Sequence, residues 1–278
     1  MSERTMTAAK ATPAEEPLLG LDRPRPGVAV LTLNRPAARN ALSVAMLDAL
    51  HKAFVTLGAD TSVAAIVLAA NGPAFSSGHD LKELTAHRAD ADKGLAFYTE
   101  AMTSCAAMMQ AIIACPKPVI AAVQGTATAA GCQLVATCDL AIAADSAQFC
   151  TPGVNIGLFC STPMVALSRN VGRKRAMEML LTGEMLSAAD AVDYGLINRA
   201  VPAADVLPQA IALAEKIAAK SPLTVAIGKR AFYAQAEMPL KEAYAYAAQV
   251  MVDNMMTRDA EEGIGAFLGK RPPEWKGR

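Results

Sequence analysis

Apolar positions along this chain form two kinds of run, and their order predicts strands and helices that alternate first and helices alone later. Short runs rich in β-branched residues or alanine, bounded by turn residues, predict buried strands. Longer segments with apolar residues three or four positions apart predict helices. The predicted strands are residues 28–33, 64–69, 119–123, 140–144 and 148–150.

Helical patterns separate these strands and occupy nearly all of the chain after Pro163. Ser43 stands at the N-cap position of a first helix that ends near Gly58, and a second helix begins near Leu81. A long helix over residues 97–114 is stopped by Pro116. The later helices are predicted at 164–171, 173–181, 188–194, 204–219, 223–236, 239–256 and 258–268, with Ser187, Asp205 and Ser221 at N-cap positions.

These patterns divide the chain into three parts. Residues 1–17 are polar, show no apolar period and are predicted to be a disordered tail. Residues 18–200 form a strand-and-helix core, and residues 201–278 form a helical region. Such a helical region with apolar faces is expected to pack against a partner subunit.

Composition and charge exclude several classes of protein. Hydrophobic residues make up 53% of the chain and charged residues 19%, which excludes disorder for most of its length. Lys plus Arg and Asp plus Glu both number 26, and this balance argues against a nucleic-acid partner. The uncharged stretches 118–138 and 146–168 are long enough to span a bilayer, but their Gln, Gly and Pro residues favour buried strand-loop-helix segments. We expect no membrane partner.

The absence of a recognisable targeting signal and the spacing of the cysteines favour a reduced, cytoplasmic location. The N-terminal segment has no apolar run, and Glu3, Glu15 and Glu16 argue against an Arg-rich transit peptide. The six cysteines lie between Cys105 and Cys160, without a CxxC pair, and the chain has only 3 His. We therefore expect buried, unpaired thiols and no metal site.

Two small-residue loops between predicted strands and helices are the candidates for chemistry. One is Phe-Ser-Ser-Gly-His-Asp at 75–80, and the other is Gly-Thr-Ala-Thr-Ala-Ala-Gly at 125–131. Such loops leave backbone N–H groups free at the positive end of a helix. Two of these groups aimed at one point form an anion site or an oxyanion hole; otherwise the loops are merely tight turns. Neither loop has the GK[ST] or GxGxxG pattern of a nucleotide site.

A series of further motifs surrounds these loops, in a fixed order along residues 28–277. It comprises Leu-Asn-Arg-Pro at 33–36, Arg-Asn-Ala-Leu-Ser at 39–43, Pro-Lys-Pro-Val-Ile-Ala-Ala-Val-Gln-Gly at 116–125, Gly-Cys-Gln-Leu at 131–134, Cys-Asp at 138–139, Leu-Thr-Gly at 181–183, Ala-Ala-Asp-Ala at 188–191 and Gly-Leu-Ile at 195–197. Together with the 75–83 segment, this order resembles the crotonase superfamily, the enoyl-CoA hydratase/isomerase family.

The resemblance implies a fold, a ligand and an assembly. The fold would be a ClpP/crotonase-like spiral of ββα units with a C-terminal helical trimerisation region, and the protein a homotrimer or a dimer of trimers. The family's enzymes are lyases of fatty acid metabolism, and they take a coenzyme A thioester without another cofactor. By this resemblance, the backbone N–H groups of His79 and Ala130 would form the oxyanion hole. The acyl-CoA contacts would fall on Arg39, Asn40, Ala41, Ser77, Gly78, Asp80 and Leu81, with Lys270 meeting CoA phosphates in this or a neighbouring subunit.

The chain departs from the family pattern where a hydratase of the family carries two glutamates. Gln133 stands at the first position and Gly153 at the second. An amide can hold a water but cannot take its proton, and glycine has no side chain. General acid–base catalysis contributes roughly 10²–10⁴-fold, so ordinary hydratase activity is doubtful. In this respect the chain resembles the enoyl-CoA hydratase domain-containing subgroup.

Other side chains near these loops leave several functions open. His79 titrates near neutrality in ordinary surroundings, and Cys150 and Cys160 are potential nucleophiles, whereas Asp80 is expected to cap a helix. The backbone oxyanion hole would support thioester hydrolysis, decarboxylation or weak hydration with Gln133 positioning water. A non-catalytic acyl-CoA-binding protein and a plain trimeric scaffold are the alternatives.

Overall fold

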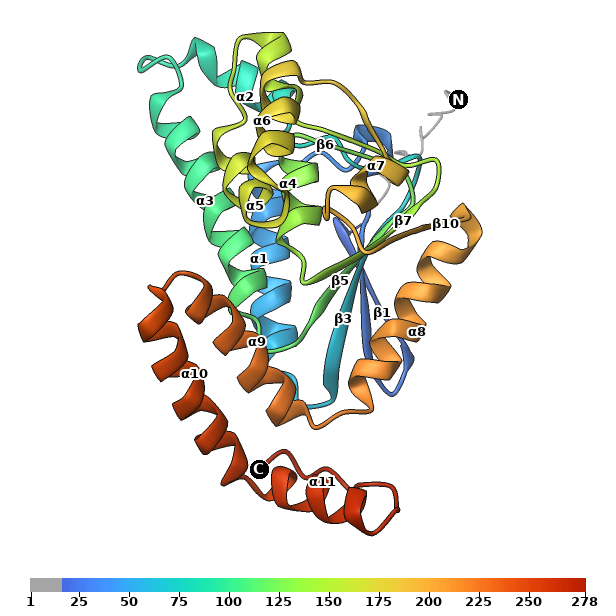
Figure 1. Cartoon of the computed structure of the whole chain (residues 1–278). Helices are drawn as coiled ribbons and strands as arrows, with labels where there is room; N and C mark the ends of the chain where they lie inside the picture. Colours follow the sequence, from blue (N-terminus) through green and yellow to red (C-terminus); the bar gives the residue numbers. More distant parts are fainter. Residues whose placement is uncertain (1–16) are drawn as a thin grey trace, which may run out of the picture.

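A six-stranded sheet forms the centre of the fold in the computed structural model, which describes residues 17–278 (Figure 1). β1 pairs with β2 in antiparallel fashion, and the other neighbours are parallel. The four sequence-predicted strands of this sheet are confirmed, and the predicted tail lies almost wholly outside the described residues. In sheet order the strands are β1 (Leu19–Arg25), β2 (Gly27–Leu33), β3 (Val63–Ala70), β5 (Val119–Val123), β7 (Leu140–Ala144) and β10 (Arg199–Val201).

A smaller sheet lies beyond the carboxyl ends of the central strands. β3, β5 and β7 each continue after a few residues into one of its strands, and a helix follows. This repeating ββα arrangement is the spiral that the resemblance implies, although the sequence itself shows no repeat. The smaller sheet has the order β4 (Ala74–Ser76), β6 (Thr126–Thr128), β8 (Gln148–Cys150) and β9 (Leu186–Ser187), and the helices that follow are α2 (Leu81–Ala86), α4 (Ala130–Thr137) and α5 (Ser161–Asn170).

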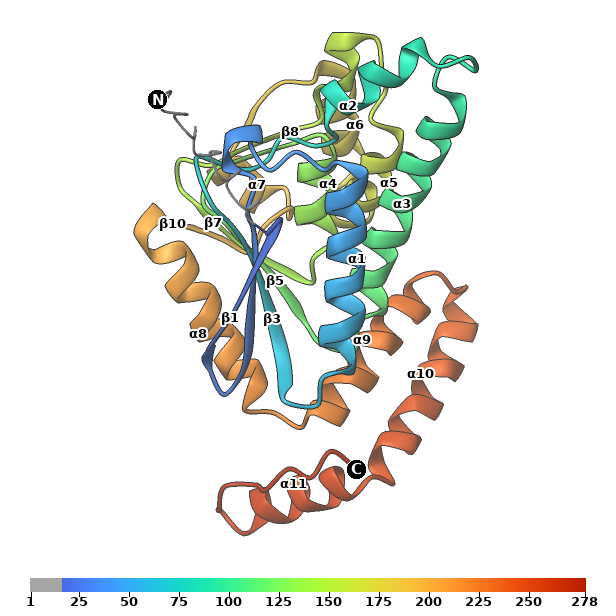
Figure 2. The same ribbon diagram turned by 180° about the vertical axis from the view of Figure 1, so that it is seen from behind.

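Helices cover both faces of the central sheet (Figure 2). α1 (Val44–Ala59) and α3 (Leu95–Ala114) pack together on one side, and α8 (Val206–Ala218) packs on β2, β3, β5 and β7 on the other. The Ser43 side chain accepts a hydrogen bond from the Met46 N–H, as a helix N-cap should. Because α8 contacts the sheet, the sequence-based boundary at residue 200 does not coincide with a boundary in packing.

The last helices form an arm that extends from the sheet (Figures 1 and 2). The Ser187 side chain caps α7 (Ala188–Asp193), and the Ser221 side chain caps α9 (Pro222–Ala236). Asp205 stands at the N-cap position of α8, as predicted, but it also ends a 3-10 turn over Ala203–Asp205 and its side chain makes no capping hydrogen bond. The remaining helices are α6 (Arg173–Thr182), α10 (Leu240–Met255) and α11 (Arg258–Leu268).

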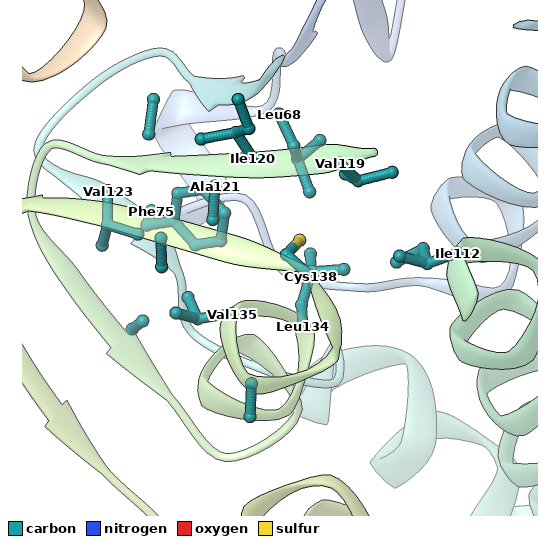
Figure 3. Close-up of a cluster of buried hydrophobic side chains, with 14 of the residues drawn as sticks. Leu68, Phe75, Ile112, Val119, Ile120, Ala121, Val123, Leu134, Val135 and Cys138 are labelled. Carbon is teal, nitrogen blue, oxygen red and sulfur yellow. The ribbon is translucent and has the colours of Figure 1, made fainter. Parts of the chain in front are cut away.

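The core between the two sheets and α4 holds the candidate loops in place. Phe75 of β4 is fully buried beside Ala121 and Val123, and Leu134 and Val135 of α4 face the same cluster (Figure 3). Burial of such side chains stabilises the fold by roughly 1.5–3 kcal/mol each. The six cysteines are buried and free, as expected. Within residues 17–278, no helix is both long enough and apolar enough to cross a membrane.

Candidate active site

The two candidate loops meet at the carboxyl ends of β4 and β6. The Thr128 hydroxyl donates a hydrogen bond to the Ser77 carbonyl over 3.0 Å. Gly78 adopts φ +84°, and a Cβ there would lie 3.1 Å from the Ala130 nitrogen and 2.9 Å from the Ala129 Cβ. Glycine is therefore required at position 78 for its conformation and for the close approach of the loops.

The N-terminus of α4 is pressed directly against β4. A Cβ on Gly131 would lie within van der Waals overlap of the Ser76 carbonyl oxygen, so no larger residue fits. Ala129 has φ 51° and ψ −120°, an uncommon conformation for a residue with a Cβ, and its N–H donates to the Cys150 carbonyl over 2.9 Å. These contacts fix the direction of the next N–H group, that of Ala130.

His79 and Ala130 present two free backbone N–H groups at this junction. His79 forms an isolated parallel bridge with Leu42, in which the Leu42 N–H donates to the Gly78 carbonyl (2.8 Å) and the Asp80 N–H donates to the Leu42 carbonyl (3.4 Å). Neither His79 nor Ala130 donates its N–H to an acceptor among residues 17–278. Ala130 opens α4, and His79 stands just before the cap of α2, so both groups lie near positive helix ends. The arrangement has the components of an oxyanion hole.

The segment expected to line the CoA pocket supports the first loop from behind. The Asn40 side chain is completely buried; it accepts from the Arg35 N–H and donates to the carbonyls of Asn71 and Ala74, each over 2.9 Å. The Ser77 N–H donates to the Arg39 carbonyl over 3.0 Å. Asn40 leaves no group free for a ligand, because its amide is fully occupied, its backbone N–H donates to the Arg35 carbonyl and its own carbonyl accepts from the Ser76 hydroxyl.

Asp80 acts as a helix cap, as expected. Its carboxylate accepts from the N–H groups of Lys82 (3.2 Å) and Glu83 (3.3 Å) and pairs with Arg35 (3.2 Å). Arg35 also donates to the Ala41 carbonyl, so one guanidinium links both segments of the site.

The remaining predicted contact residues are separated in space. Leu81 is 52% exposed beside the first loop, and Arg39 is also exposed. Lys270 follows α11, which lies at the opposite end of the molecule from α2 (Figure 1). Within one chain Lys270 does not line this site, and only a neighbouring subunit's Lys270 remains a candidate.

Two buried side-chain atoms of the site have no hydrogen-bond partner in the described part of the chain, His79 Nε2 and Gln133 Oε1. Gln133 is 5% exposed in the first turn of α4. Burial holds the pKa of His79 below its ordinary value, and a hydrogen bond to the Leu42 backbone acts in the opposite direction. Unsatisfied buried polar atoms cost stability, so their presence at the junction of the loops indicates a place for a ligand or water.

The position of the second family glutamate has no room for a side chain. A Cβ on Gly153 would lie 2.9 Å from Cys160 Sγ and 2.9 Å from the Leu158 carbonyl oxygen. The surrounding loop therefore occupies the space that a side chain at this position would need. The position differs from the family pattern in the shape of the loop as well as in the missing carboxylate.

The cysteines near this loop do not have the properties of nucleophiles. Burial raises the pKa of the Cys150 thiol to about 11 and also raises that of Cys160. A reactive cysteine needs a depressed pKa and a base beside it. No group of three or more potential metal ligands occurs among residues 17–278.

One polar cluster escaped the sequence analysis. Lys229 of α9 donates to Asp139 (2.6 Å) and to the carbonyls of Ile112 (2.9 Å) and Lys117 (3.0 Å), and the Tyr233 hydroxyl donates to Asp139 (2.9 Å). Asp139 belongs to a quoted motif, but no local signal identifies Lys229 as its partner 90 residues away. This cluster lies at the amino ends of β5 and β7, away from the candidate loops.

Comparison with known proteins places these features in a family context. The family model described as enoyl-CoA hydratase/isomerase matches residues 23–278. The mitochondrial enoyl-CoA hydratase domain-containing protein 3 of Rattus norvegicus is 47% identical over 269 residues, covering 97% of this chain and 88% of that protein.

Solved structures agree with the sequence comparison. An enoyl-CoA hydratase from Mycobacterium smegmatis superposes with a TM-score of 0.89 at 55% identity, covering 94% of this chain and 99% of that one. Human enoyl Coenzyme A hydratase domain-containing protein 3 superposes with a TM-score of 0.88 at 46% identity, covering 93% and 100%. These comparisons bear out both the fold and the family that the sequence motifs indicate.

Proposed function

Because this chain belongs to the enoyl-CoA hydratase/isomerase family, we propose that it binds an acyl-CoA thioester and polarises the thioester carbonyl between the N–H groups of His79 and Ala130. The observation that carries this proposal is the convergence of the two loops, with Gly78 packed against Ala130 and both N–H groups free. A carbonyl oxygen held there gains negative charge as the reaction proceeds, and fixed donors stabilise that charge.

Ordinary enoyl-CoA hydration is not the reaction we propose. Gln133 has no carboxylate, and Cys160 and the Leu158 carbonyl close the space at Gly153. We expect crotonyl-CoA hydration, followed as loss of enoyl absorbance, to fall well below the usual enzyme range of roughly 1–10³ s⁻¹. A rate within that range would contradict this part of the proposal.

The oxyanion hole is tested on the unaltered protein by comparing two ligands in calorimetry. Butanoyl-CoA carries the thioester carbonyl, and its thioether analogue butyl-CoA lacks only that oxygen. Two hydrogen bonds of about 0.5–1.5 kcal/mol each predict roughly 5- to 150-fold weaker binding of the thioether. Equal affinities would show that the carbonyl does not occupy the hole, and absence of binding for both would contradict the acyl-CoA proposal.

The C-terminal arm supports a second part of the proposal, self-association into a homotrimer or a dimer of trimers. α9, α10 and α11 expose large apolar side chains that a single chain leaves in water. Sedimentation analysis tests this directly, and a monomer at micromolar concentration would contradict it. The most exposed of these residues are Phe232, Leu240, Tyr244, Met256, Phe267 and Leu268.

The cellular location stays a prediction. The sequence favours the cytoplasm, whereas the rat relative carries the word mitochondrial in its name. Fractionation of cells that express the full chain distinguishes the two compartments.

A further inference from the structure

His79 offers more to the site than its backbone N–H. Its Nε2 atom is buried and has no partner among residues 17–278. Burial, the larger influence on the ring, lowers the pKa of His79 and favours the neutral imidazole, while the Leu42 backbone acts in the opposite direction. A neutral ring that carries its proton on Nδ1 keeps a lone pair on the unpartnered Nε2, which is the arrangement of a base.

From this geometry we propose that His79 Nε2 is the general base of a thioester hydrolysis, with Gln133 Oε1 holding the attacking water. This inference rests on the proposed function, because it needs a thioester carbonyl in the oxyanion hole. It gives both unpartnered atoms of the site a role, and it replaces the carboxylates that positions 133 and 153 lack.

The proposed base and the oxyanion donors belong to the two loops that meet. The His79 ring and one oxyanion donor belong to the same residue, so a carbonyl bound at that N–H would lie within one side-chain length of the imidazole. Gln133 lies one helical turn after the other donor, Ala130, on α4. A water between Nε2 and Oε1 would meet an acceptor on each side, one for each of its hydrogens.

The proposed reaction consumes only water and the thioester. The water oxygen bonds to the carbonyl carbon while Nε2 takes its proton, and the two N–H groups hold the resulting oxyanion. The carbon–sulfur bond then breaks, and the imidazolium returns the proton to the departing CoA thiolate. The products are a carboxylic acid and CoA with a free thiol.

The carboxylates that follow His79 in the chain are engaged elsewhere. Asp80 pairs with Arg35 and caps α2, and the Glu83 carboxylate accepts from the Val44 N–H over 3.1 Å. The thiols of Cys132 and Cys150 stay protonated, because burial raises the pKa of each. Burial then dominates the His79 pKa and keeps the ring neutral, and able to accept a proton, at pH 7.

The test uses His79→Gln, which keeps the backbone N–H and a polar side chain but cannot take a proton. Acetyl-CoA, butanoyl-CoA and decanoyl-CoA serve as probes, with loss of thioester absorbance as the readout. We expect His79→Gln to lower kcat by roughly 10²–10⁴-fold while calorimetric affinity changes less than about threefold. The matched control is His87→Gln, because His87 stacks on Phe97 away from the loops and its loss should leave kcat unchanged.

The pH profile separates a base from a merely structural residue. In the unaltered protein kcat/KM should rise with pH as the imidazole loses its proton, with a midpoint below the ordinary histidine value of about 6.5. The rising limb should be absent in His79→Gln.

Failure of the inference and failure of the proposed function give different results. Binding of acyl-CoA without hydrolysis of any probe, or hydrolysis that His79→Gln leaves unchanged, overturns the role of His79 and leaves the proposed function standing. Absence of binding for every probe overturns the proposed function itself.

Discussion

Two clusters of polar side chains lie at opposite ends of the central strands, and they differ in whether their buried atoms have hydrogen-bond partners. At the amino ends of β5 and β7, the Lys229 ammonium has three acceptors, and both carboxylate oxygens of Asp139 have donors. At the carboxyl ends, His79 and Gln133 each keep an unpartnered atom. The first cluster holds α9 to the sheet, and the second gives up stability in a place where a ligand is expected.

The amino-end cluster should show the largest stability effect. Asp139→Leu leaves the Lys229 ammonium buried without its carboxylate, and loss of one partner of a buried ion pair costs about 3–5 kcal/mol. Chemical denaturation measures this change. Adding Lys229→Met should recover part of the loss, and a single variant as stable as the unaltered protein would remove the contrast between the two ends.

Gly78 should be more sensitive than another glycine with the same backbone conformation. Gly78→Ala meets Ala129, Thr128 and Ala130 at 2.9–3.1 Å, whereas Gly157, at φ +77°, has no atom within 4 Å of a Cβ. We expect Gly157→Ala to cost about 1 kcal/mol for its left-handed backbone, and Gly78→Ala to cost about 1–3 kcal/mol more through overpacking. Thermal unfolding of the pair measures the difference, and acyl-CoA affinity should fall only in Gly78→Ala.

The loop at Gly153 can be tested by a double-mutant cycle with Cys160. Gly153→Ala places a methyl group 2.9 Å from Cys160 Sγ, so it should destabilise the chain by about 1–3 kcal/mol. Cys160→Ala removes that sulfur and should reduce the cost of Gly153→Ala by at least about 0.5 kcal/mol. Additive effects would show that the sulfur does not occupy the space of the missing side chain.

The smallest expected effect, and one of opposite sign, belongs to Gln133. Gln133→Leu removes a buried acceptor that has no partner, so stability should stay equal or rise by about 1 kcal/mol while thioester turnover falls. Gln124→Leu is the matched control, because Gln124 donates to the carbonyls of Gly72 and Ala74 and its replacement should destabilise the chain. A Gln133→Leu variant less stable than Gln124→Leu would contradict the functional interpretation of the unpartnered amide.

Much of the fold was predictable from local patterns because those patterns are strong. The predicted central strands are apolar runs buried on both faces, and the helices carry clear periods and serine caps. β1 was missed because it is an edge strand with polar residues and Pro24, which give it no apolar run. β4, β6, β9 and β10 have two or three residues each, too few for a period to show.

The sequence by itself determined the family, the two small-residue loops and the absence of glutamates at positions 133 and 153, since each of these is a matter of residue type in a local segment. Only the tertiary structure decided that the loops carrying the His79 and Ala130 N–H groups meet, that Cys160 fills the space at Gly153 and that Asn40 is wholly engaged with backbone. It likewise left His79 Nε2 and Gln133 Oε1 unpartnered. The physical reason is the same in each case: satisfaction and close approach depend on atoms from segments tens of residues apart, and no local pattern encodes their distance.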